Sequence, residues 1–274
     1  MAYVAPILYA LFVWWFSTGL VMYVVGRDRR THVNSMLVMS ALSIGAFYAL
    51  WVTSNDTSVA GAYMAFTAAL VVWGWHEMSF LTGLITGSRT TPCPGRPNEP
   101  TNTRAPLVPA IQSVIFHEIA IAATAGLLFA MLWSGANHVG LWTFVILWLM
   151  RLSAKLNIYF GVQNLTEHFL PANLQYLKTY FCRRPMNAFF PFAVTASTTA
   201  TVLLAAAAAH VAATPFDVTG MTFLATLLAL AVLEHWFLVM PIPAERLWSW
   251  GLASRSEIPE PDARESERVV LVTT

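Results

Sequence analysis

The stretch WGWHEMSF, residues 73–80, places His76 and Glu77 in the middle of an apolar run that extends from Val59 to Ile85. A charged side chain at the depth of a lipid bilayer is costly, so this carboxylate has to face protein or water rather than lipid. Two other apolar runs carry the same kind of pair. They are FHEIA, with His117 and Glu118, and LEHWF, with Glu234 and His235.

The composition around these pairs is that of a membrane protein. Of 274 residues, 57% are hydrophobic and 11% are charged, and the mean hydropathy is +0.59. These values are typical of a polytopic helical membrane protein rather than a soluble domain. Uninterrupted apolar runs also exclude the alternating pattern of a membrane β-barrel.

Seven runs are long enough to cross a hydrocarbon core about 30 Å thick. They lie near residues 4–25, 34–54, 60–86, 107–133, 139–162, 189–210 and 220–242. We therefore predict an all-α bundle of seven transmembrane helices over residues 1–250, followed by a flexible cytoplasmic tail at 251–274. The first two helices carry no ionisable group, and we expect them to serve as scaffold.

The basic residues fall in alternate connections, which indicates the orientation. Thirteen of the fifteen Lys and Arg residues follow the first, third, fifth or seventh run: Arg27, Arg29, Arg30, Arg89, Arg96, Arg104, Lys178, Arg183, Arg184, Arg246, Arg255, Arg264 and Arg268. The loops near residues 55, 135 and 212 contain none. By the positive-inside rule the N-terminus is periplasmic and the C-terminus is cytoplasmic.

Two cytoplasmic connections are long. Residues 87–106, GSRTTPCPGRPNEPTNTRAP, are dense in Pro, Gly and Thr and are expected to form an exposed loop, either a solvated linker or a partner-binding surface. Residues 165–189 mix apolar and basic side chains, which suits an amphipathic segment in the membrane interface. Glu167 and His168, at its start, either lie on the surface or join a buried site.

The ionisable residues inside the runs are expected to form one layer in the cytoplasmic half of the bilayer. With a rise of about 1.5 Å per residue, the three acidic residues Glu77, Glu118 and Glu234 reach a similar depth. Arg151 and Lys155 are four residues apart on the same helix face, so they need acids nearby as counter-charges. Asn157 and Asn164 add polar groups at related spacing further along the chain.

Besides a proton or solute pathway, three interpretations of this layer are open. Glu and His on facing helices build di-iron carboxylate centres, although those centres space Glu and His three residues apart rather than adjacent. A second interpretation is a site for a tetrapyrrole or quinone, in which a His ligates magnesium and Arg151 or Lys155 meets an acid group. The third is a buried salt-bridge network that sets helix packing without chemistry.

Several longer motifs resemble a known family. They are WGWHEMSFLTGLITGSRTTPCP, FHEIA, GLWTFVILWLMRLSAKLNIYFGVQNLTEHFLP, YFCRRPMNAFFPFAVT and LLALAVLEHWFLVMPIP, within about residues 59–250. Together they are similar to the PuhE-type photosynthetic complex assembly protein 2 family of purple phototrophic bacteria. The resemblance implies a gene in the photosynthesis cluster and a role in building the reaction-centre and light-harvesting complexes or in modulating bacteriochlorophyll supply. It supplies no catalytic residues.

We therefore expect a multi-pass protein of the bacterial inner (intracytoplasmic) membrane that supports assembly of the photosynthetic complex. It would handle bacteriochlorophyll or a precursor at the Glu/His/Arg layer. The alternative is a metal-dependent oxidoreductase, with iron as the candidate metal, acting on a tetrapyrrole, carotenoid or quinone. The expected partners are the lipid bilayer and either photosynthetic complex subunits or pigment-synthesis enzymes, with no nucleic acid.

Overall fold

The computed structural model describes residues 2–165, 167, 170–240, 242 and 244–252. Seven of its helices are long and apolar enough to cross a membrane, which confirms the predicted all-α, multi-pass architecture. They are α1 (Val4–Val25), α2 (Arg29–Val52), α3 (Val59–Leu81), α5 (Ile115–Leu132), α6 (Val139–Phe160), α7 (Phe189–His210) and α8 (Pro215–Phe237). The described residues form no β-strand, only two isolated bridges.

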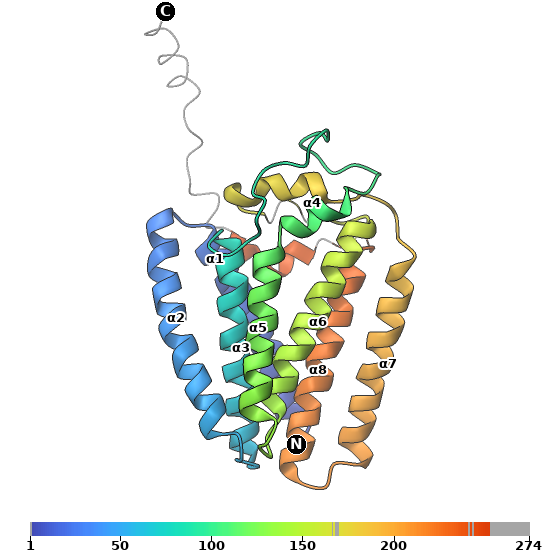
Figure 1. Cartoon of the computed structure of the whole chain (residues 1–274). Coiled ribbons are helices and arrows are strands. Elements are labelled where there is room, and N and C mark those ends of the chain that lie inside the picture. Colours follow the sequence, from blue (N-terminus) through green and yellow to red (C-terminus); the bar gives the residue numbers. More distant parts are fainter. Residues whose placement is uncertain (1, 166, 168–169, 241, 243, 253–274) are drawn as a thin grey trace, which may run out of the picture.

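Helices α3, α6 and α8 pack against one another and form the centre of the bundle (Figure 1). The other four helices surround them, with α1 against α8 and α3, α2 against α3, α5 against α6, and α7 against α8. Aromatic side chains fill the centre, and the rings of Phe66 and Phe223 stack with centroids 4.2 Å apart. This shared core holds the three helices that carry most of the predicted layer at fixed positions.

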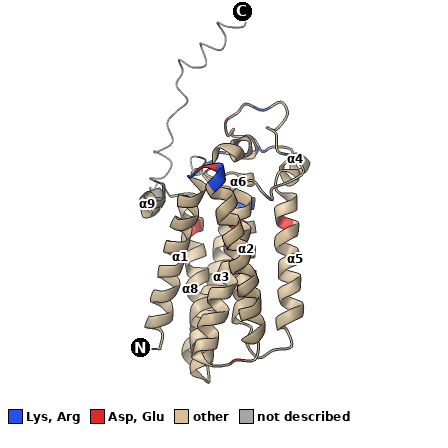
Figure 2. Cartoon of the chain, turned by 90° about the vertical axis from the view of Figure 1, so that its left-hand side faces the viewer, with Lys and Arg blue, Asp and Glu red and all other residues tan. Residues whose placement is uncertain are grey.

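Long connections cover one end of the bundle (Figure 1). We call the described parts of residues 82–114 and 161–188 the cap; it includes the short helices α4 (Leu107–Gln112) and η2 (Ala172–Tyr180). Most Lys and Arg residues also lie at this end, as Figure 2 shows. The first described residues lie at the opposite end from the last (Figure 1).

The cap has a core of its own, although residues 87–106 are mostly exposed, as expected of a loop, and only Cys93 and Ala105 among them are buried. Cys93 is buried, and its backbone N–H donates to Thr179 Oγ1 at 2.8 Å. Arg89 Nε donates to Tyr180 Oη at 2.9 Å. Helix η2 is thus half buried against residues 87–106 rather than lying alone in the membrane interface.

The helix expected at 107–133 is broken between α4 and α5. Residues 86–89 run beside the break: the His117 N–H donates to Thr86 O at 2.8 Å, and the Arg89 N–H donates to Gln112 O at 3.1 Å. A side chain on Gly87 would place its Cβ 2.0 Å from Gln112 O. The break therefore depends on contact with a segment some 25 residues earlier in the chain.

Other helix ends differ from the prediction for local reasons. Helix α3 ends at Leu81 rather than near residue 86, because Gly83 (φ +79°) turns the chain and Leu84 N–H donates to Ser79 O at 2.8 Å. Helix α8 begins at Pro215 rather than near residue 220, because Thr214 and Asp217 form a capping box. It ends at Phe237, short of the expected 242.

The chain after α8 returns to the bundle. The short helices η3 (Ala244–Trp248) and α9 (Ser249–Leu252) pack against α1. Trp15 Nε1 donates to Leu247 O at 2.8 Å, and Trp248 Nε1 donates to Trp15 O at 3.0 Å. The expected tail therefore starts later than residue 251, and residues 253–274 of that tail lie outside the described residues.

Candidate functional site

Helix α6 connects the predicted layer. Three of its side chains reach three different helices. Arg151 Nη2 lies 3.1 Å from Glu77 Oε2 on α3, and Lys155 Nζ lies 2.5 Å from Glu118 Oε1 on α5. Between them, Ser153 Oγ lies 2.9 Å from His235 Nε2 on α8. The structure thus brings together most of the residues that the sequence analysis selected.

The layer lies closer to the helix ends than the sequence suggested. Glu118 is in the first turn of α5, and Glu234 is in the last turn of α8. Acidic residues inside the bundle appear in Figure 2 towards the end that carries α4 and α9. The cap covers this end, so the polar groups lie between the membrane-spanning core and the cap.

The Lys155–Glu118 pair is largely enclosed. The two side chains are 20% and 19% exposed, and Trp148 Nε1 donates a second hydrogen bond to Glu118 Oε2 at 3.3 Å. Trp148 and Lys155 can share one acceptor because they lie two turns apart on the same face of α6. Lys155 Nζ also lies 5.2 Å from the centroid of the Phe80 ring. Lys155 is therefore held by its partner rather than extended to the membrane surface.

In the Arg151–Glu77 pair the arginine is more open, with its side chain 39% exposed, whereas Glu77 is 16% exposed. Glu234 is exposed as well, and its Oε1 accepts a hydrogen bond from Trp14 Nε1 on α1 at 2.8 Å. Glu77 on α3 and Arg151 on α6 belong to helices that both pack against α8, which carries Glu234. We call Trp14, Glu77, Arg151 and Glu234 the open cluster, because it is the accessible part of the layer.

The three histidines of the layer are buried and differ in their hydrogen bonds. His235 Nδ1 donates to the backbone oxygen of Ala231 at 2.8 Å, so a neutral ring accepts from the Ser153 hydroxyl at Nε2. His76 Nε2 lies 3.0 Å from Thr124 Oγ1, whereas its Nδ1 has no hydrogen-bond partner among the described residues.

His117 is the most isolated of the three. It is fully buried, and neither ring nitrogen has a hydrogen-bond partner among the described residues. Its ring packs against Phe80 and His76, with centroids 4.7 Å and 6.4 Å away. Because the His117 ring is buried among aromatic side chains, it is not accessible to a ligand at the open cluster.

These contacts do not assemble a metal centre. Among the described residues, no group of three or more His, Cys, Asp and Glu side chains is placed to hold a metal ion. The reason is the direction of the carboxylates: Glu77 and Glu118 face cations on α6, and Glu234 faces an indole on α1. Within the described part of the chain, the ligand set that the metal interpretation requires is therefore not formed.

Three of the remaining candidates make their contacts outside the layer. Asn157 is buried where α6 meets the start of α7, and it accepts a hydrogen bond from Asn187 Nδ2 at 3.1 Å. Asn164 Nδ2 donates to Phe237 O at 2.9 Å, which ties the chain after α6 to the end of α8. Glu167 pairs with Arg183 away from the layer, and His168 lies outside the described residues.

Two members of the site were missed by the sequence analysis. Trp14 lies on a helix without ionisable groups, which was expected to serve as scaffold, yet it is the hydrogen-bond donor to Glu234. Thr124 is the partner of His76. Neither has a signal in the sequence, because an indole or hydroxyl in an apolar helix is common and only the packing shows what it faces.

Comparison with known proteins gives one relative and one family. The relative is an "Uncharacterized 30.4 kDa protein in puhA 5'region" from Rhodobacter capsulatus, which is 39% identical over 248 residues and aligns with 89% of each chain. No solved structure matches the chain. A family described as "Protein of unknown function (DUF3623)" matches residues 1–258. The chain therefore belongs to the DUF3623 family.

Proposed function

We propose that this protein supports assembly of the photosynthetic reaction-centre and light-harvesting complexes by holding bacteriochlorophyll or a precursor at the open cluster. It would act in the bacterial inner (intracytoplasmic) membrane. Its partners there would be subunits of the photosynthetic complex or enzymes of pigment synthesis.

Two separate observations support the photosynthetic context. The relative from Rhodobacter capsulatus is named for a position in the 5' region of puhA. The motifs between residues 59 and 250 also resemble the photosynthetic complex assembly family. Both point to the same group of genes, and the seven candidate membrane spans suit a factor that works on membrane-embedded complexes.

The proposal that the protein binds pigment rests on the exposure of Glu234. This carboxylate lies in the last turn of a membrane-spanning helix, yet among the described residues it has no ion-pair partner and its hydrogen bond comes from Trp14. A carboxylate at that position is expected to serve a ligand or pathway, because leaving it exposed to lipid is costly. An oxygen ligand of this kind suits the magnesium ion of a chlorin.

The neighbouring groups complete a site for such a ligand. The Arg151 guanidinium is partly exposed and can donate to a ring carbonyl or a carboxylate substituent. Two indoles lie on the α1 side of Glu234: Trp14 donates a hydrogen bond to the carboxylate, and the Trp14 ring lies 5.2 Å from that of Trp248 between centroids. Flat aromatic side chains provide apolar surface against which a macrocycle can pack.

The test is to purify the protein from native membranes in mild detergent and to record its absorption spectrum and metal content together. We expect pigment at close to one equivalent in the wild-type protein. Glu234→Gln should lower the pigment content severalfold while the protein stays folded, because a glutamine can still accept the hydrogen bond from Trp14. Glu99→Gln, in the exposed part of the cap, is the matched control and should retain the pigment.

Two results would contradict the proposal. One is wild-type protein without any pigment. The other is Glu234→Gln protein that retains as much pigment as the Glu99→Gln control. Complex assembly is followed in the same strains by the absorbance of the reaction-centre and light-harvesting complexes in membranes, and it should fall together with the pigment content.

A further inference from the structure

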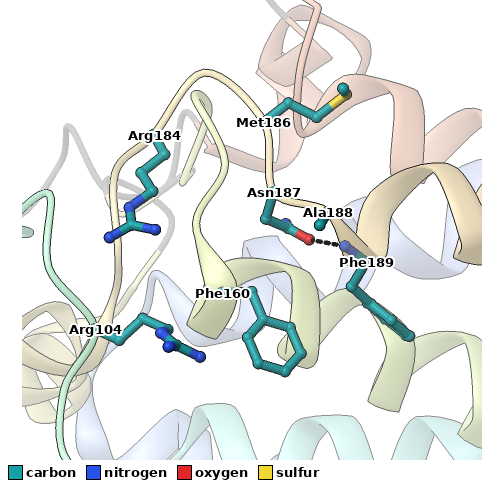
Figure 3. Close-up of a pocket in the computed structure, with 7 residues that line it drawn as sticks. All are labelled: Arg104, Phe160, Arg184, Met186, Asn187, Ala188 and Phe189. Carbon is teal, nitrogen blue, oxygen red and sulfur yellow. Dashed lines mark hydrogen bonds between the residues drawn. The ribbon is translucent and has the colours of Figure 1, made fainter.

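A second candidate site lies at the junction of α6, α7 and the cap, away from the open cluster. It is a cavity of about 440 Å³. Figure 3 shows the residues that line it: Arg104, Phe160, Arg184, Met186, Asn187, Ala188 and Phe189. The two arginine side chains occupy one side of the cavity in this view, and the two phenylalanine rings occupy the lower part (Figure 3).

The cavity carries two positive charges without a negative one. No acidic residue is among its lining residues. The Arg104 guanidinium lies 5.8 Å from the centroid of the Phe160 ring and makes no hydrogen bond to a described residue. Arg184 uses its Nε to donate to Asn102 O at 2.8 Å, and its two terminal nitrogens make no hydrogen bond to a described residue. Two guanidinium groups are the donor set that proteins use to bind phosphate.

The backbone beside the cavity fixes the position of Arg184. Its N–H donates to Val162 O at 3.1 Å, beside Gly161, which has a φ of +120°. A Cβ at Gly161 would lie 2.9 Å from Arg184 Cδ, so the approach of the arginine requires glycine there.

The buried Asn187 forms the opposite wall. Its Nδ2 donates to Gly161 O at 2.9 Å, and its Oδ1 accepts from the Phe189 and Phe190 N–H groups at 2.8 Å and 3.0 Å. Figure 3 shows the bond to Phe189. Arg184 and Asn187, on the two sides of the cavity, are therefore both held by hydrogen bonds.

The position of the cavity indicates an amphiphilic ligand. Phe160 is the last residue of α6 and Phe189 is the first residue of α7, so the rings lie where two membrane-spanning helices meet the cap. The charged groups lie on the cap side of those rings, since Arg104 and Arg184 belong to the cap connections. Lipid phosphates occupy this boundary, just outside the hydrocarbon region.

We propose that this cavity binds the phosphate of an anionic phospholipid, with Arg104 and Arg184 donating to the phosphate and Phe160 and Phe189 contacting the adjoining apolar part. The site is independent of the pigment proposed at the open cluster. It would anchor the cap to the membrane boundary between α6 and α7.

Native mass spectrometry of the full-length protein with added phosphatidylglycerol tests the site. We expect the wild-type protein to retain one lipid that Arg104→Gln loses, with the apparent dissociation constant raised at least about tenfold. Arg104→Gln is the primary variant, because Arg104 makes no hydrogen bond within the described part of the chain. Arg30→Gln, which removes the same charge from an exposed position at the same end, should retain the lipid.

Two comparisons decide between a lipid and a small anion. Phosphatidylcholine should not be retained, and inorganic phosphate at millimolar concentration should not displace phosphatidylglycerol. Equal retention of phosphatidylglycerol by Arg104→Gln and Arg30→Gln would overturn the site. Displacement by inorganic phosphate would overturn the assignment to a lipid in favour of a soluble phosphate compound. Thermal unfolding of each variant, unchanged from the wild type, confirms that the comparison is between folded proteins.

Discussion

At the scale of single residues, Lys155 illustrates how the bundle accommodates a charge. Its ammonium group has a carboxylate at 2.5 Å and an aromatic ring nearby, and both members of the pair are about one-fifth exposed. Such a pair gains little net stability over apolar residues, but removing one member leaves an unpaired charge in a poorly solvated environment. The pair therefore contributes more to the specificity of α5–α6 packing than to stability.

Removing one member of this pair should be more damaging than removing both. We expect Glu118→Gln to lower the free energy of unfolding by about 3–5 kcal/mol, because Lys155 loses its counter-charge. The double variant Glu118→Gln with Lys155→Met should recover most of that loss, as measured by chemical unfolding in detergent micelles.

The Glu167–Arg183 pair at the protein surface is the control for these variants. Glu167→Gln breaks the pair with Arg183, whose side chain is 51% exposed, and should cost less than about 1 kcal/mol. If the double variant were less stable than Glu118→Gln alone, Lys155 would have a stabilising role that does not depend on Glu118.

At the scale of elements, the break between α4 and α5 positions the His117–Glu118 pair. Residues 112–116, QSVIF, contain neither glycine nor proline, so no local signal ends the helix there. Instead, the backbone of residues 86–89 supplies an acceptor to the His117 N–H and a donor to Gln112 O. Those bonds replace part of the helical ladder, and α5 starts immediately afterwards.

Gly87 is the residue on which this contact depends. We expect Gly87→Ala to lower the free energy of unfolding by at least about 1–3 kcal/mol, because the added Cβ would overlap backbone atoms that cannot rotate away. Hydrogen exchange measured by mass spectrometry should become faster across residues 107–118. Gly126→Ala is the control, since a Cβ there meets nothing within 4 Å; it should be neutral or stabilising by about 0.5–1 kcal/mol. Similar stability for the two variants would contradict this account of the helix break.

At the scale of the whole molecule, most basic residues lie at the same end of the bundle as the long, folded connections. The loops at the end opposite the cap are short, whereas the cap end carries the long connections and most of the basic residues (Figure 2). Basic residues within about 15–20 positions of a span bias it toward the cytoplasmic side. The cap is therefore predicted to be cytoplasmic.

Cysteine labelling tests this orientation. In a Cys93→Ser, Cys182→Ser background, Ser134→Cys should react with a membrane-impermeant maleimide in intact spheroplasts, because it is exposed at the end opposite the cap. Thr103→Cys, exposed in the cap, should react only after lysis. The reverse pattern would show that the protein is inserted the other way round.

The sequence alone determined the number of membrane spans, the end at which the basic residues gather, and the ionisable residues that had to be paired. These properties follow from hydropathy and from the cost of charge in lipid, which act on each segment separately. The pairing itself required the tertiary structure: Arg151 with Glu77, Lys155 with Glu118, and Trp14 with Glu234. So did the folded cap and the break before α5. Each depends on which residues distant in the chain become neighbours, and on the directions in which their side chains point, which are decided only when the helices pack.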